Sequence, residues 1–337
     1  MNPILHKNSR GQIHRGENLP AIEYADGTKM WYINGDRHRD DDLPAVEYDS
    51  GDKEWWVNGM YHRDDGLPAI ELADGTKEWY VSGKCHRDNG PAIDRVDGHK
   101  EWFVNGQRHR DGGLPAIERT TGSREWWVDG KRHREGGLAS IEFINGSKEW
   151  FVNGHRHRDG GLSAIEWFNG DAEWYVNGQR HRDNGLPAID CTDDIKAWWV
   201  NGQRHRDNDL PAVELINGNK EWWVNGLRNR DGGLPAIDYI GYKAWWVRDQ
   251  RHREGGFPAI ERKDGSKEWW VNGKEWSSEK GETFFSFCQK IQDKRRISAQ
   301  KKIYFWWIQI CYDLTKECGL RMAQKNLDVF ESMMKDN

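Results

Sequence analysis

The chain has 337 residues, of which 36% are hydrophobic and 31% charged, and its net charge is −5. This composition excludes a large aliphatic core, whereas the 21 tryptophans supply rings that each bury a large apolar area. Residues 1–274 carry 39 Lys and Arg against 46 Asp and Glu, while residues 275–337 carry 11 against 9. The acidic balance of the long part disfavours a general nucleic-acid binder, because phosphate contacts need a basic surface.

The N-terminal sequence and the cysteines bear on the compartment. Residues 1–12 contain no apolar signal segment, and no stretch reaches the roughly 18 apolar residues of a membrane-spanning helix. The five cysteines are odd in number and widely spaced without a CxxC pair, which is typical of free thiols in a reducing compartment. We therefore expect an intracellular protein that is not secreted.

A His-Arg pair recurs along the chain after a short lead-in, residues 1–10, and defines a repeat array over residues 11–274. The spacing is 24 residues except for two intervals of 23, so the array contains eleven units. The pairs begin at residues 14, 38, 62, 86, 109, 133, 157, 181, 205, 229 and 252, with Asn229 in place of a histidine.

Each unit contains two turn dipeptides between apolar runs, such as Asp74-Gly75 and Ser82-Gly83. Such dipeptides favour two-residue hairpin turns, because both central residues must adopt positive φ. Two turns per unit predict two strands per unit, and the frequent Gly and Pro residues disfavour helices. The sequence therefore predicts an all-β fold, an elongated solenoid of antiparallel hairpins. Arg248-Asp249 replaces one Asn-Gly turn and the turn before it is a residue short, so we expect distortion over residues 229–250.

The turns also predict how the strands pair. A two-residue turn at Asn58-Gly59 places Trp56 opposite Tyr61 and places Glu54 opposite Arg63. Opposite charges across two strands are stabilising, so we expect Glu54 and Arg63 to form an ion pair.

The same geometry at the other turn of the unit, Asp74-Gly75, places Ile70 opposite Trp79. It leaves Glu71 opposite Glu78, where a bulge or a water molecule would intervene. A slip of one residue would place Ile70 opposite Glu78, and we favour the unslipped register because it keeps Ile70, Trp79 and the histidine on one face.

Two consecutive aromatic residues occur in every unit, and the first of them is always Trp. Neighbouring strand residues point to opposite faces, so we expect one buried ladder and one ladder on the outer face. The expected core ladder includes Trp55, Trp79, Trp102, Trp126, Trp150, Trp174, Trp198 and Trp222. The expected outer ladder, a candidate binding surface, includes Trp56, Tyr80, Phe103, Trp127, Phe151, Tyr175, Trp199 and Trp223. The alternative is that these rings pack against the Ala and Pro residues of neighbouring units.

The segment WVNGKRHREGGLASIEFINGSKEW, residues 127–150, resembles the MORN repeat, a β-hairpin repeat in which an aromatic residue, an NGK turn, an RHG step and a DG turn recur. The resemblance covers residues 11–274. The residue after the histidine is Arg in this chain where the MORN pattern has Gly, so the membrane association of MORN proteins is not carried over.

The combination of HRDGGLPAIE with KEWWVNG also resembles uncharacterised repeat proteins that large DNA viruses of amoebae encode in multiple copies. That resemblance implies a viral origin, with the host cytoplasm or the virion as the location. It implies no established activity.

The pattern changes to a helical tail over residues 275–337. Residues 283–334 contain no Pro and only one Gly, and apolar residues fall at helical spacing over 303–318 and 320–334. We expect the tail to cap the open end of the sheet, with residues 284–291 folded back so that their phenylalanines are buried. The alternative is that its basic and aromatic residues bind a membrane surface or a partner; these are Lys294, Arg295, Arg296, Lys301, Lys302, Trp306 and Trp307.

Neither a metal site nor a catalytic site is predicted. Histidines of successive units would lie ~9.5 Å apart, twice the strand spacing, which is too far to share one zinc ion, so we expect them to pack on the tryptophans. Glu and Arg recur in most units, and a repeated pair suits an ion-pair ladder better than an active site. We therefore expect no enzyme activity and no cofactor.

Repeat arrays offer long surfaces, and the sequence predicts a non-enzymatic scaffold that binds an unidentified protein partner. The alternative is a module that binds carbohydrate or a small cation in aromatic slots between hairpins. A membrane-surface tether through the tail is compatible with either function, and bare sheet edges would favour self-association. Deep repeated slots would favour a small ligand, and a flat surface would favour a protein.

Overall fold

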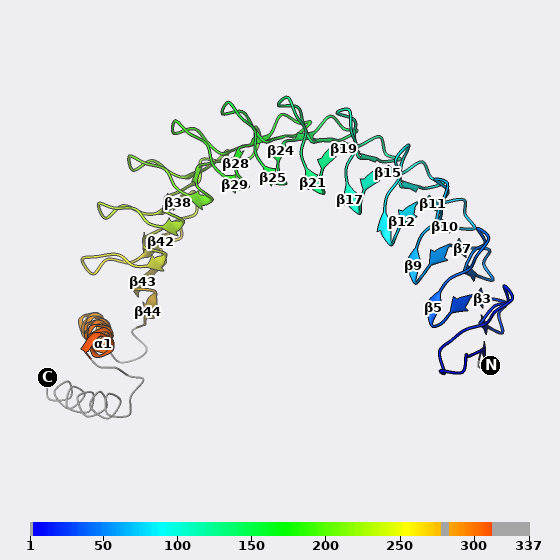
Figure 1. Ribbon diagram of the computed structural model, residues 1–337. Coiled ribbons are helices and arrows are strands. Elements are labelled where there is room, and N and C mark those ends of the chain that lie inside the picture. Colours follow the sequence, from blue (N-terminus) through cyan, green and yellow to red (C-terminus); the bar gives the residue numbers. More distant parts are fainter. Residues whose placement is uncertain (1–2, 278–282, 312–337) are drawn as a thin grey trace. The chain divides into compact units, whose positions relative to one another are not determined.

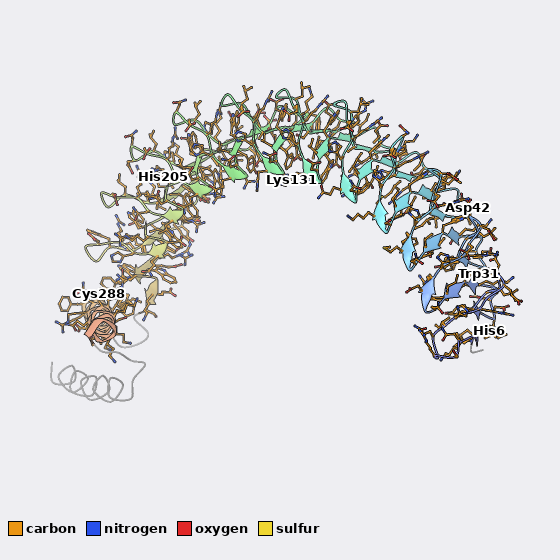
Figure 2. The ribbon with its side chains drawn as sticks, in the orientation of Figure 1. His6, Trp31, Asp42, Lys131, His205 and Cys288 are labelled. Carbon is orange, nitrogen blue, oxygen red and sulfur yellow. The ribbon has the colours of Figure 1, made fainter. Side chains whose placement is uncertain are left out.

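The computed structural model describes residues 3–277 and 283–311 (Figure 1), with side chains up to residue 302 (Figure 2). The chain divides into two units, residues 1–203 and 204–337. Both units repeat one motif, in which two short antiparallel strands join a main sheet and a tight two-stranded ribbon follows. The all-β hairpin repeat with a C-terminal helix that the sequence predicts is therefore confirmed.

The main sheet of the first unit pairs its strands in chain order, each antiparallel to the next. Its strands are β1 (Ile4–Leu5), β2 (Ile22–Glu23), β3 (Lys29–Met30), β6 (Val46–Glu47), β7 (Lys53–Glu54), β10 (Ile70–Glu71), β11 (Lys77–Glu78), β14 (Ile93–Asp94), β15 (Lys100–Glu101), β18 (Ile117–Glu118), β19 (Arg124–Glu125), β22 (Ile141–Glu142), β23 (Lys148–Glu149), β26 (Ile165–Glu166), β27 (Ala172–Glu173), β30 (Ile189–Asp190) and β31 (Ile195–Ala197).

The second unit continues the same pattern and ends in a helix. Its main-sheet strands are β34 (Val213–Leu215), β35 (Lys220–Glu221), β38 (Ile237–Tyr239), β39 (Tyr242–Ala244), β42 (Ile260–Arg262), β43 (Lys267–Val271) and β44 (Lys274–Trp276), and the helix is α1 (Phe284–Cys311).

The ribbons join the second aromatic residue of each unit to the residues before the His-Arg pair. They are formed by β4 (Tyr32–Ile33) and β5 (Asp36–Arg37), β8 (Trp56–Val57) and β9 (Met60–Tyr61), β12 (Tyr80–Val81) and β13 (Lys84–Cys85), β16 (Phe103–Val104) and β17 (Gln107–Arg108), β20 (Trp127–Val128) and β21 (Lys131–Arg132), β24 (Phe151–Val152) and β25 (His155–Arg156), β28 (Tyr175–Val176) and β29 (Gln179–Arg180), β32 (Trp199–Val200) and β33 (Gln203–Arg204), β36 (Trp223–Val224) and β37 (Leu227–Arg228), and β40 (Trp246–Val247) and β41 (Gln250–Arg251). In the first unit they lie along one side, where Figure 1 labels β5, β9, β12, β17 and β21.

The ribbon register agrees with the prediction from the sequence. Trp56 pairs with Tyr61 and Val57 pairs with Met60. The turn between them, Asn58-Gly59, has φ values of 50° and 75°, the left-handed region that a two-residue hairpin turn requires.

The predicted register of the main sheet is wrong by one residue. Ile70 pairs with Glu78, and Glu71 pairs with Lys77. The connecting loop holds five residues and is closed by a hydrogen bond from the Leu72 amide to the Thr76 carbonyl, at 2.9 Å. This register also removes the contact between two glutamates, because Glu71 now lies between lysines on both neighbouring strands.

The predicted Glu54–Arg63 ion pair is also wrong, because the ribbon pairing does not extend to Glu54, which lies in β7 of the main sheet. Glu54 pairs with Ile70 on the neighbouring strand of the main sheet. Its carboxylate accepts hydrogen bonds from the Trp56 indole (2.8 Å) and the Tyr61 hydroxyl (3.2 Å). Arg63 instead bonds to Glu71 of the next unit (3.1 Å) and to Asp42 (2.8 Å). The arginine therefore links consecutive units rather than the two strands of one hairpin.

One expectation about an irregular segment needs correction, while the lead-in adds a strand that the sequence did not predict. In the lead-in, Ile4 and Leu5 form an edge strand on β2. Around residues 229–250 the distortion is confined to the short turn, where Tyr239 pairs with Tyr242 across a two-residue loop. The ribbon β40–β41 keeps the regular pairing, because Arg248 and Asp249 adopt φ values of 49° and 61°.

Helix α1 packs on the last units of the array, as expected for a cap. The Phe284 ring lies 5.6 Å from the Trp276 ring, and the Arg295 guanidinium donates to the Gln250 side chain at 2.6 Å. Phe285, by contrast, is 77% exposed, so the expected burial is wrong for this residue. The side chains of 303–311 and all of residues 312–337, which include the expected helix 320–334, lie outside the described residues.

Candidate functional site

The first tryptophan of a unit lies next to the main sheet, and in ten of the eleven units its indole nitrogen donates to a backbone carbonyl. Trp126 is typical: it is 5% exposed, and its Nε1 donates to the carbonyl of Gly113 at 2.9 Å. Eight of the eleven are 5% or 6% exposed, namely Trp31, Trp55, Trp79, Trp126, Trp150, Trp198, Trp222 and Trp245, while Trp102, Trp174 and Trp269 are half-buried. The structure thus places most of the predicted core ladder in the interior.

The arginine of the His-Arg pair covers the face of this tryptophan. The Arg134 guanidinium carbon lies 3.6 Å from the centroid of the Trp126 ring. The same guanidinium donates to the Ala139 carbonyl (3.1 Å) and to the Glu142 carboxylate (2.7 Å) of the next unit. A glycine at this position, as in the MORN pattern, would lack all three contacts.

The histidine of the pair joins consecutive units by hydrogen bonds instead of packing alone. Nδ1 of His133 accepts the backbone N–H of Asn153 (3.3 Å), and its Nε2 lies 2.9 Å from the Glu135 carboxylate. The arrangement recurs in most units, with Asp in place of Glu135, and assigns the proton to Nε2. This role was not predicted from the sequence, although an acidic residue stands two positions after nine of the ten histidines of these pairs.

The second aromatic residues do not form the exposed outer ladder that the sequence predicts. Phe151 and Tyr175 are each 8% exposed, and the other six predicted members, Trp56, Tyr80, Phe103, Trp127, Trp199 and Trp223, are half-buried. The Tyr175 hydroxyl donates to Glu173 at 2.8 Å, and burial first, then this carboxylate, raises the pKa of Tyr175 to about 12. Arginines from its own ribbon and from the preceding one flank the ring, with Arg180 and Arg156 centred 5.5 Å and 5.7 Å away. These rings therefore stabilise the interior.

A periodic set of exposed aliphatic residues was missed by the sequence analysis. The residue before the Pro-Ala-Ile-Glu segment is 38% to 58% exposed in ten of the units. We call this set the leucine stripe; it comprises Leu19, Leu43, Leu67, Leu114, Leu138, Leu162, Leu186, Leu210, Leu234 and Phe257. The signal was present in the sequence as a leucine that recurs after a Gly-rich or Asp-rich loop.

Cavities open beside the leucine stripe, between the His-Arg loops of consecutive units. One of about 460 Å³ lies between the loops at residues 62–67 and 86–89, with Trp79 and Val81 in its lining. Similar cavities of about 440 Å³ and 340 Å³ are lined by Leu210 with Leu234 and by Leu234 with Phe257. Their volumes lie near the lower end of the range for ligand pockets.

The rims of these cavities carry carboxylates while the arginines point inward. Asp64 and Asp88, which partner the histidines of their loops, are each 84% exposed at the side chain. Arg63, from the same loop, is only 13% exposed because it covers a tryptophan. The surface around the leucine stripe is therefore apolar and acidic.

The predicted tail residues lie on α1 and do not form one cluster with the array. Arg295 faces the array, lining a cavity of about 660 Å³ with Phe284 and Cys288. Lys294 and Arg296 are exposed, as is Lys302, and Lys301 is half-buried. Trp306 and Trp307 lie in α1, but their side chains are outside the described set.

Neither metal binding nor thiol reactivity is supported by the described residues. No group of three or more His, Cys, Asp or Glu side chains within residues 3–277 and 283–302 is close enough to hold a metal ion. Burial and neighbouring glutamates raise the pKa of the Cys85 thiol to about 12, so its reactive thiolate form is suppressed. In the part of the chain that the structure describes, no helix has the length and apolarity to cross a membrane.

Comparison with known proteins adds no relative. No protein-family model matches the chain, and a search of curated proteins finds no significantly similar sequence.

Proposed function

We propose that the array is a non-enzymatic protein-binding scaffold whose contact surface is the leucine stripe. The observation that carries the proposal is the recurrence of an exposed apolar side chain, Leu in nine units and Phe in one, at one loop position. Scattered exposed leucines are normal, but a regular apolar set beside open cavities is typical of an interaction surface. The resemblance to viral repeat proteins suggests the host cytoplasm or the virion as the place of binding.

The charge of the surface indicates the chemistry of the partner. Exposed carboxylates such as Asp111 and Asp159, 95% and 90% exposed, stand beside the stripe, whereas the loop arginines are stacked on tryptophan. A partner with apolar and basic residues would complement this surface, since complementary charge favours association and specificity.

The aromatic-slot alternative is less well supported by the geometry. Sugar rings and quaternary ammonium groups need an open aromatic face, and Arg87, Arg134 and Arg182 already cover such faces at 3.5 to 3.7 Å. A guanidinium at that distance also repels a cationic ligand. The membrane-tether alternative rests on the exposed basic residues of α1, and no contact within the described residues favours it.

A capture experiment with matched variants tests the proposal. The full chain is immobilised and exposed to an amoebal extract, beside one variant with Leu114, Leu138 and Leu162 changed to Ser. A control variant carries Ser at Val96, Ile144 and Phe168, which are 67%, 73% and 70% exposed on the other loops of the array. Captured proteins are quantified by mass spectrometry after circular dichroism has verified that all three chains are folded.

We expect a set of proteins that the wild type and the control capture and that the leucine variant loses at least fivefold. Raised salt should weaken their capture, because the proposed surface is acidic. The proposal is refuted if the leucine variant captures the same proteins as the wild type in the same amounts.

A further inference from the structure

The residue before the two aromatic residues of a unit is Glu in eight of the eleven units. These glutamates point into the interior, and Glu101, Glu125, Glu149 and Glu221 are each at most 9% exposed. Two units have Ala at this position, Ala197 and Ala244. Ala244 is 1% exposed and is the last residue of the main-sheet strand β39.

The buried glutamates accept hydrogen bonds from side chains of their own unit. Glu125 accepts the Trp127 indole N–H, two residues later, at 3.2 Å and the Arg132 Nε–H, seven residues later, at 3.1 Å. The Trp donor recurs with Glu54, Glu221 and Glu268 at 2.8 to 2.9 Å, and the Arg donor recurs with Glu101, Glu149 and Glu173 at 2.8 to 3.1 Å. The carboxylate is thus the common acceptor of the ribbon.

Both donors are present in the Ala244 unit, but the acceptor is absent. Trp246 and Arg251 stand two and seven residues after Ala244, like their counterparts around Glu125. The Arg251 guanidinium lies 5.2 Å from the Trp246 ring centroid, close to the 4.8 Å between Arg132 and Trp127. Trp246 Nε1 and Arg251 Nε are buried and have no hydrogen-bond partner.

The charges around Ala244 also favour an anion. Arg228 and Arg251 both lie over Trp246, with guanidinium carbons 5.3 Å and 5.2 Å from its ring centroid. The nearest glutamates of the flanking units are already engaged, Glu221 by Trp223 and Tyr239, and Glu268 by Trp270 and Arg262. Arg251 therefore lacks the carboxylate to which Arg108, Arg132, Arg156 and Arg180 donate in their own units.

We propose that the Ala244 unit binds a small monocarboxylate between Trp246 and Arg251. Relative to glutamate, alanine lacks a CH₂–COO⁻ group, which is the size and shape of acetate. The ligand methyl faces the apolar cluster of Ile237, Ala244 and Ile260, against which Tyr239 and Tyr242 pack, and the ligand oxygens accept the two unpartnered N–H groups. Buried donors without an acceptor are unfavourable, so binding is driven by their satisfaction. The site does not depend on the proposed protein-binding surface.

Nuclear magnetic resonance of the indole N–H signals of the full chain tests this site. The Trp246 signal is identified by its loss in a Trp246→Phe variant, and sodium acetate is titrated against sodium chloride at equal ionic strength. We expect a saturable shift of the Trp246 signal in the millimolar range with acetate. The Ala244→Glu variant carries its own carboxylate and should weaken acetate binding at least tenfold.

A positive control comes from a regular unit. Glu125→Ala removes the same acceptor and should make the Trp127 signal respond to acetate. The proposal is overturned if the Trp246 signal of the wild type does not respond up to 100 mM acetate, or if the Ala244→Glu variant responds equally. An equal response to chloride would overturn the assignment to a carboxylate.

Discussion

Replacing Glu125 by Ala removes one of the buried carboxylates and tests how much each of them contributes to the free energy of unfolding. Glu125 is 4% exposed and accepts hydrogen bonds from Trp127, Arg132 and Arg119. The variant leaves the indole N–H without its acceptor inside the unit. The two guanidinium groups can turn to water, because their side chains are 38% and 45% exposed.

The magnitude follows from these three donors. Breaking a fully buried ion pair costs about 3–5 kcal/mol, but the arginines are exposed enough to be partly solvated, which reduces their share. The buried indole alone accounts for about 1–3 kcal/mol. We therefore expect Glu125→Ala to lower the free energy of unfolding by about 2–3 kcal/mol, consistent with Ala197 and Ala244 being tolerated in the same array.

The matched control is Glu118→Ala in the same unit. Glu118 pairs with Arg110 at 2.8 Å but is 40% exposed, so its loss should cost less than about 1 kcal/mol. Native-state hydrogen exchange of the β18–β19 amides reads the local free energy even if the array does not unfold in one step. Equal losses in the two variants would refute the role assigned to the buried glutamates.

Acid should reduce the difference between the Glu125→Ala variant and the wild type. Burial raises the pKa of Glu125, but the hydrogen bonds and charges of Arg119 and Arg132 outweigh it and hold the pKa below the ordinary value. A lowered folded pKa means that the stabilisation is present above the unfolded pKa of about 4.3 and is lost as pH falls through the folded pKa. Hydrogen exchange at pH 5 and below checks this, and a constant difference would contradict it.

Three further perturbations test the packing, the histidines and the cap. Trp126→Ala should cost about 3–5 kcal/mol in the same exchange measurement, since the ring is buried and holds Arg134; a loss under about 1 kcal/mol would contradict its core position. Burial, and secondarily the nearby Arg295, lowers the pKa of His252, so stability should fall as pH drops below about 6.5, where the unfolded histidine takes up a proton. His252→Asn, which copies Asn229, should show a smaller fall in melting temperature between pH 7 and 5.5 than the wild type. Phe284→Asp should uncover the end of the array and cause concentration-dependent self-association, measured by size-exclusion chromatography with light scattering. Phe285→Asp, at an exposed position, should not cause it. Identical elution of the two variants would refute the cap.

The sequence was sufficient for the ribbon but not for the main sheet. Asn58-Gly59 fits one turn type, and that turn alone determines the pairing of Trp56 with Tyr61. Asp74-Gly75 looks the same in sequence, but it lies inside a five-residue loop, so a count from the dipeptide places the strand one residue out. The alternation of Glu71 with lysines across the sheet was the signal that would have corrected it.

The candidate site was predicted less well than the fold, because alternation along a strand was applied where the strand is interrupted. Trp126 lies between β19 and β20, so Trp127 does not point to the opposite face of one continuous sheet. The Trp127 indole instead donates a hydrogen bond to Glu125 of its own unit. The leucine stripe lies in loops, where strand periodicity does not predict which side chains are buried. The exposure of these side chains follows from the folded structure alone.

Site-specific photo-cross-linking tests the proposed binding surface most directly. A photoreactive phenylalanine is placed in the full chain at Leu138, in the leucine stripe, or at Ile144, an equally apolar and more exposed position on the other loop. After irradiation in amoebal extract, we expect covalent adducts with a discrete set of proteins from position 138 and at most background from position 144. Equal labelling from both positions, or adducts from position 144 alone, would contradict the assignment of binding to the stripe.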